Sequence, residues 1–121
     1  MLDDFLALGL AGEEGPALRE RLLSEMPRED LLGFTRWVCV RAWLPEDVVE
    51  DAVAAGVRQY VILGAGLDSF AYRRPEMVGP LRVDEVDHPK TQAWKRQRLA
   101  EVHVGLPDGL VQRMVAATVA G

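Results

Sequence analysis

The chain has few of the residues that build disulfide frameworks, metal clusters or cationic surfaces. Its 121 residues include one cysteine, Cys39, and two histidines, His88 and His103. A single cysteine cannot form an internal disulfide or a cysteine-based zinc cluster, and two scattered histidines do not make a convincing metal site. There are 14 basic residues against 19 acidic ones, for a net charge of −5. This acidic balance argues against a nucleic-acid or anionic-membrane surface, since both need a basic face.

Long apolar runs, internal repeats and low-complexity tracts are also absent. The amino terminus is acidic and its apolar run is short, so we expect neither a signal peptide nor a membrane span there. With 49% hydrophobic and 27% charged residues, the composition is ordinary for a soluble protein. The length suits one domain or a piece of one, and a cytosolic location is the default expectation.

Three helices are predicted in the first half of the chain. The first covers residues 16–26, the second begins near Arg28, and Pro45 is expected to end the second helix and open the third. Gly56 stands where a left-handed helix cap is expected. The second helix has apolar residues at helical spacing. Three of its side chains are expected in the core: Trp37, Cys39 and Trp43.

Beyond residue 57 the pattern changes to strands separated by loops and helices. Residues 58–63 end in a continuous apolar run, typical of a strand covered on both faces in a parallel sheet. A second strand fits residues 81–86, a helix fits 90–103, and 110–119 is interpreted as a strand rather than a helix. This order indicates an α/β fold. The basic side chains of the predicted helix are expected to form a solvated face: Lys90, Lys95, Arg96 and Arg98.

A glycine turn and an acid follow the two predicted strands. Gly64-Ala65-Gly66 comes directly after the first strand, where glycine permits positive φ and close approach of a ligand to the backbone. Asp87 lies 21 residues after Gly66, close to the spacing of about 20 at which a carboxylate binds ribose hydroxyls. Asp84 and Glu85 are nearby competitors, but Asp87 is better placed at the strand tip. Together these features predict a nucleoside-binding site.

Position 69 bears on which nucleoside is bound. A dinucleotide fingerprint has its third glycine there, and this chain has Ser69. The serine argues against a pyrophosphate resting on a helix amino terminus, and so against NAD. An NAD-binding module stays open as the less favoured alternative.

The run from Leu63 to Ser69, Leu-Gly-Ala-Gly-Leu-Asp-Ser, is followed at the right distance by Glu-Val-Asp-His-Pro at 85–89. This combination resembles the leucine carboxyl methyltransferase family, closest to its actinobacterial branch of S-adenosylmethionine-dependent methyltransferases. The resemblance covers about residues 28–103. It implies a Rossmann-like α/β methyltransferase fold with an amino-terminal helical cap, here residues 1–44, followed by a partial cofactor-binding domain, residues 45–121. Because the family sheet has seven strands, we expect a truncated fold, the amino-terminal half only.

The resemblance also implies an activity, which is methyl transfer from S-adenosylmethionine to an oxygen of a small-molecule carboxylate or hydroxyl acceptor. Arg41 would pair with the methionine carboxylate, Asp87 would hold the ribose, and Asp68 and Arg73 would brace the loop, with cofactor contact open to Asp68. The implied cofactor-binding residues are Arg41, Gly64, Ala65, Gly66, Asp68 and Asp87. No catalytic residue is assigned, because a carboxylate acceptor needs no general base. A non-catalytic truncated remnant, or a self-associating fragment that forms homo-oligomers, stays open as another reading.

Overall fold

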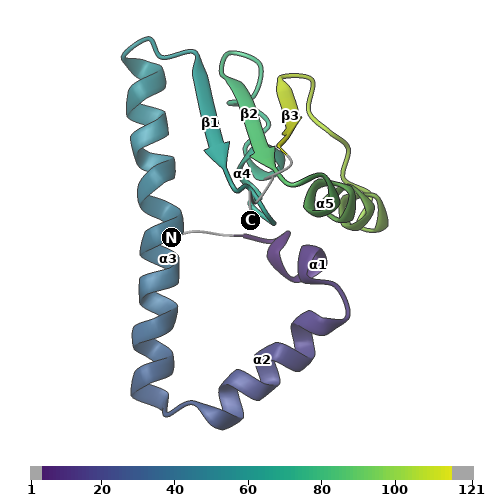
Figure 1. The fold of residues 1–121 in the computed structure, drawn as a ribbon. Helices are drawn as coiled ribbons and strands as arrows, with labels where there is room; N and C mark the ends of the chain where they lie inside the picture. Colours follow the sequence, from purple (N-terminus) through teal and green to yellow (C-terminus); the bar gives the residue numbers. More distant parts are fainter. Residues whose placement is uncertain (1–3, 116–121) are drawn as a thin grey trace, which may run out of the picture.

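The computed structural model describes residues 4–115 and has a mixed α/β fold (Figure 1). This confirms the α/β class expected from the order of elements. The elements in chain order are α1 (Ala7–Ala11), α2 (Glu14–Glu25), α3 (Arg28–Ala54), β1 (Gln59–Leu63), α4 (Phe70–Arg73), β2 (Arg82–Asp87), α5 (Pro89–Glu101) and β3 (Leu110–Met114).

The three strands form a small parallel sheet in the order β1-β2-β3. In register, Tyr60 of β1 pairs with Val83 of β2, which pairs with Leu110 of β3. Parallel neighbours require crossover connections, and α4 and α5 provide them. The carboxyl ends of β1 and β2 therefore lie side by side. The predicted third strand is confirmed at β3, and residues 116–119 of that prediction lie outside the described residues.

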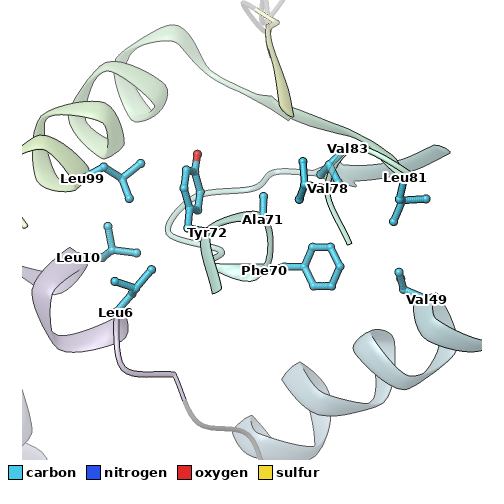
Figure 2. Close-up of a cluster of buried hydrophobic side chains, with 10 residues drawn as sticks. All are labelled: Leu6, Leu10, Val49, Phe70, Ala71, Tyr72, Val78, Leu81, Val83 and Leu99. Carbon is cyan, nitrogen blue, oxygen red and sulfur yellow. The ribbon is translucent and has the colours of Figure 1, made fainter. Parts of the chain in front are cut away.

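The hydrophobic core lies on one face of the sheet. Tyr60, Ile62 and Val83 point to this face, and the Tyr60 ring meets the Phe70 ring edge-on at a centroid distance of 5.3 Å. Helices α3, α4 and α5 and the segment around α1 all contribute to this side (Figure 2). The buried side chains that Figure 2 draws are Leu6, Leu10, Val49, Phe70, Ala71, Tyr72, Val78, Leu81, Val83 and Leu99.

The opposite face of β1 is open, so the expectation of a strand covered on both faces was wrong. Val61 is 46% exposed and Leu63 is 78% exposed. The continuous apolar run alternates between faces along the strand. Because α3, α4 and α5 all pack on the face of Tyr60 and Val83, no described helix covers Val61 and Leu63.

Helix α3 does not stop at Pro45, which corrects the prediction of two helices divided there. Proline removes one backbone N–H, so the carbonyl of Arg41 loses its helical partner. The helix nevertheless continues, because Val49 and Val53 in its later turns pack on the core. The prediction that Gly56 follows a helix in the left-handed region is confirmed by its φ of 99°.

The first half of α3 extends away from the sheet together with α2 (Figure 1). Trp37 is 58% exposed, Trp43 is 46% exposed and Cys39 is exposed, so the expectation that they lie in the core was wrong. These residues do lie on a helix, as their spacing predicts, but no described segment packs on this part of its surface. The predicted helix 16–26 is confirmed as α2, whose apolar side chains are likewise unburied.

Candidate functional site

The glycine loop after β1 has the conformation that its sequence requires. Gly64 and Gly66 have φ values of 64° and 49°, a region that side chains other than glycine's rarely adopt. The backbone N–H of Gly64 donates to the carbonyl of Val86 at 2.8 Å, which pins the loop to β2. A Cβ at Gly64 would meet nothing within 4 Å, while Ala65 between the glycines is buried. The loop backbone is therefore open to a ligand at the end of the strand.

Asp87, the last residue of β2, is hydrogen-bonded to this loop. Its carboxylate accepts hydrogen bonds from the backbone N–H groups of Gly66 and His88. Two carboxylate oxygens offer about four lone-pair positions, so acceptor capacity remains for sugar hydroxyls. The structure thus brings Asp87 and the glycine loop together, and the ribose role stays a prediction.

Asp84, one competitor of Asp87, points to the open face of the sheet, where its carboxylate already has three partners. Its carboxylate accepts from the Gln59 amide at 2.7 Å and pairs with Arg82 at 3.1 Å and Arg113 at 2.8 Å. The hydrogen bond from Gln59, followed by those from the two arginines, lowers the pKa of Asp84 to about 2 despite its burial. Asp84 is therefore a structural anion that joins the three strands.

Glu85, the other competitor, lies in a buried polar network on the core side. Its carboxylate contacts Lys95 Nζ at 2.7 Å, and its other oxygen accepts from Tyr72 and Gln112, each at 3.2 Å. Burial, and then the Glu85 charge, raise the pKa of the Tyr72 hydroxyl well above its usual range. Glu85 is 0% exposed and is not available to a ligand.

Lys95 corrects the prediction of a solvated basic face on α5. Its side chain is 1% exposed, whereas Lys90 and Arg96 on the same helix are exposed. Lys95 shares the inward stripe of α5 with the buried Gln92 and Leu99. Positions 92, 95 and 99 follow helical spacing, so the sequence contained a signal for this burial. The charge of Lys95 concealed that signal, since a buried lysine is rare without a partner.

A cavity of about 440 Å³ lies between the middle of α3 and the segment from β1 to the start of α4. Its polar lining includes Arg41, Glu46, Tyr60 and Asp68. Burial raises the pKa of Tyr60, with the Asp68 and Glu46 charges adding to the effect, so its hydroxyl stays protonated and can donate a hydrogen bond. The cavity thus brings Arg41 and Asp68 together. The glycine loop and Asp87 are not among its lining residues.

Arg41 projects from α3 into this cavity, and its guanidinium carbon lies 5.3 Å from the centroid of the Trp37 ring. Trp37 in turn stacks on Phe34 at 6.5 Å. Within residues 4–115, Arg41 forms no ion pair. Its charge is therefore available to an anion.

Asp68 and Arg73 do not pair with each other. Asp68 Oδ1 instead accepts from the backbone N–H of Phe70 at 2.9 Å, which shapes the turn into α4. Arg73 reaches Ser69, Glu46 and the amino-terminal segment. Each residue therefore stabilises the loop through a different contact.

Residues 4–115 contain no group of three or more histidine, cysteine, aspartate or glutamate side chains arranged to hold a metal ion. In the same range, no helix has the length and apolar character needed to cross a membrane. The cytosolic location expected from the sequence stays a prediction.

The chain is similar along nearly its whole length to a methyltransferase family. A family model described as leucine carboxyl methyltransferase matches residues 1–120. A Bacillus subtilis protein named "Putative S-adenosyl-L-methionine-dependent methyltransferase YktD" is 32% identical, over 91% of this chain and 43% of its own length. Proteins of the same general name from Mycobacteroides abscessus and Parafrankia are each 37% identical, over 80% and 87% of this chain and 32% and 34% of their own lengths. The chain therefore spans less than half the length of these relatives.

Proposed function

The chain belongs to the leucine carboxyl methyltransferase family, and from this premise we propose that it is the cofactor-binding part of an S-adenosylmethionine-dependent methyltransferase. The relatives from Bacillus subtilis, Mycobacteroides abscessus and Parafrankia are named for that cofactor. The proposed reaction moves a methyl group to an oxygen of a small carboxylate or hydroxyl acceptor. Because the chain spans less than half of the relatives, a non-catalytic fragment that still binds the cofactor is the second candidate.

The sheet supports a Rossmann-like arrangement for this fold. In open parallel sheets whose strands are joined by helices, as β1-β2-β3 are, ligands bind outside the carboxyl ends of the strands. The glycine loop and Asp87 lie at those ends. In this proposal residues 1–44 act as a helical cap and residues 45–121 as a partial cofactor-binding domain.

One observation carries the proposal: Asp87 is hydrogen-bonded to the glycine loop, and Asp68, which follows this loop, shares a cavity with Arg41, which forms no ion pair within residues 4–115. Gly64, Ala65 and Gly66 would give the cofactor a bare backbone to lie against. Asp87 would accept hydrogen bonds from the ribose hydroxyls. Arg41 would bind the methionine carboxylate through two parallel N–H donors of its planar guanidinium group. Asp68 would line the same cavity as Arg41.

The bound sulfonium would supply a methyl group that is already activated. The residues of this chain then contribute by binding and orientation, which hold the reacting groups in line. The aromatic side chains of α3 at the cavity, Phe34 and Trp37, would help to exclude water. No described residue is assigned as a general base.

Cofactor choice is the direct test of the proposal. S-adenosylhomocysteine is expected to bind more tightly than NAD, because Arg41 offers a partner for its carboxylate and Ser69 replaces the dinucleotide glycine. Isothermal titration of the chain with each ligand measures both affinities. Equal affinities, or tighter binding of NAD, would contradict the methyltransferase proposal. A turnover assay on a binding-competent chain then separates the enzyme from the non-catalytic fragment.

Replacing Asp87 with alanine tests the ribose contact. Loss of a hydrogen bond to a charged group costs about 1.5–3 kcal/mol, so affinity for S-adenosylhomocysteine should fall by about ten- to a hundredfold. The matched control is Asp108→Ala, which removes an exposed carboxylate distant in sequence from the loop. An Asp87→Ala variant that stays folded and keeps its affinity would refute the ribose role.

A further inference from the structure

Arg73 is a buried cation that joins three segments around the cavity. Its side chain is 7% exposed. Its Nε donates to Ser69 Oγ at 2.8 Å and lies 3.5 Å from Asp4 Oδ1, while its terminal nitrogen donates to Glu46 of α3. Ser69 also donates to Asp4. One side chain thus connects the turn into α4 to α3 and to the amino-terminal segment.

Polar contacts that hold α3 in place are few. Among the described residues, the ion pairs between α3 and the rest of the chain are those of Glu46 with Arg73 and Arg74 and that of Glu50 with Arg74. Arg74 is 28% exposed and Glu50 is 50% exposed, so their pair is weakened by solvent. The Glu46–Arg73 pair is the most buried of the three.

This buried pair lies directly beside the turn of α3 that lacks one backbone hydrogen bond because of Pro45. Pro45 precedes Glu46 and leaves the carbonyl of Arg41 without its helical partner. On the amino-terminal side of Pro45, α3 presents exposed side chains and lacks ion pairs to the described remainder of the chain. The position of Arg41 therefore depends on how firmly the helix is held at Glu46.

We propose that Arg73 is a positioning residue that, by holding Glu46, places Arg41 across the cavity from Asp68. This inference rests on the proposed function, because it gives Arg41 the carboxylate end of the cofactor. Arg73 itself is enclosed by its protein partners and acts through α3. Its loss should therefore weaken recognition of the amino-acid end of the ligand and spare the nucleoside end.

Two ligands distinguish recognition of the amino-acid end from recognition of the nucleoside end. S-adenosylhomocysteine carries the amino-acid group, and 5′-methylthioadenosine has the same nucleoside without it. Arg73→Gln is expected to lower affinity for S-adenosylhomocysteine about tenfold and to leave that for methylthioadenosine unchanged. The matched control is Arg74→Gln, which removes the neighbouring, more exposed arginine and should change neither affinity. An Arg41→Met/Arg73→Gln double variant should bind no more weakly than Arg41→Met alone.

A ligand-independent measurement follows α3 itself. Cys39, the single cysteine of the chain, is exposed on α3, and Ala100 is exposed on α5. Spin labels at Cys39 and at an Ala100→Cys substitution report the distance between the helices by pulsed electron paramagnetic resonance. Arg73→Gln should broaden the distance distribution, and Arg74→Gln should not. If Arg73→Gln fails to fold, Arg73→Lys takes its place with the same expectations, because lysine keeps the charge but lacks the planar set of guanidinium donors.

The outcomes separate the two proposals. Equal loss of both ligands in a folded Arg73 variant, or an unchanged distance distribution, overturns the positioning role and leaves the proposed function intact. Failure of the unsubstituted chain to bind S-adenosylhomocysteine overturns the proposed function, and the positioning role falls with it. Selective loss of S-adenosylhomocysteine together with a broadened distribution supports both.

Discussion

Replacing Lys95 with methionine is expected to lower the free energy of unfolding by about 3–5 kcal/mol. The substitution removes the ammonium group 2.7 Å from the Glu85 carboxylate, and both side chains are almost fully buried. Glu85 would then keep a buried charge with only the hydroxyl of Tyr72 and the amide of Gln112 as partners. Chemical denaturation followed by circular dichroism measures the loss.

Two further variants test whether the loss of stability comes from leaving the Glu85 charge without its lysine partner. Lys90→Met changes an exposed lysine on the same helix and should stay within about 0.5 kcal/mol of the parent chain. A Glu85→Met/Lys95→Met double variant removes both charges, and replacing a buried pair with apolar groups of similar volume is often neutral. The double variant should therefore be more stable than Lys95→Met alone. A loss under about 1 kcal/mol in Lys95→Met, or a double variant that is less stable still, would contradict this role for the pair.

Local signals were sufficient to predict the central elements of this fold. The apolar run of β1, the glycine turn and the acid that ends β2 depend on short-range chemistry, and all three lie where they were expected. Glycine is needed at φ values of 64° and 49°, whatever the rest of the chain does. The adjacency of Asp87 and the glycine loop then follows from the shared direction of parallel strands.

Burial was harder to predict, because it depends on what lies next to an element. The stripe containing Trp37 and Trp43 has the helical spacing of a core-facing surface, yet no described segment covers it. Lys95 presents the opposite case, since a charged residue is buried where a distant glutamate provides its partner. Pro45 was read as a helix end, but packing of the later turns of α3 offsets the lost hydrogen bond.

Candidate site residues were predicted as separate motifs, and the structure determines which of them meet. Arg41 and Asp68 share a cavity, while Asp87, at the end of β2, is hydrogen-bonded to the glycine loop. Arg73 was expected to brace the loop, but its link to Glu46 could not be read from sequence. That contact joins positions 27 residues apart and depends on how α3 crosses the core.

The isolated chain is expected to dimerise, aggregate or stay partly molten at micromolar concentration. Parallel sheets are almost always covered on both faces, yet Leu63 and Val61 are exposed on the open face of β1. The outer strands β1 and β3 also have unpaired edges among the described residues, and such edges invite pairing with another chain. Exposed apolar side chains of α3 add to this surface. Light scattering and a thermal melt measure the particle mass and the cooperativity of unfolding.

The open sheet face can be tested as the source of this association. Leu63→Lys places a charge at its most exposed apolar position, and Leu106→Lys places the same charge at a loop residue that is 52% exposed. The first substitution should shift the mass distribution toward the monomer, because burying an unpaired lysine against another chain is costly. The second should leave the distribution unchanged. A parent chain that is monodisperse, monomeric and unfolds in one sharp transition would contradict the prediction. Equal effects of the two substitutions would show that association does not depend on the open face of β1.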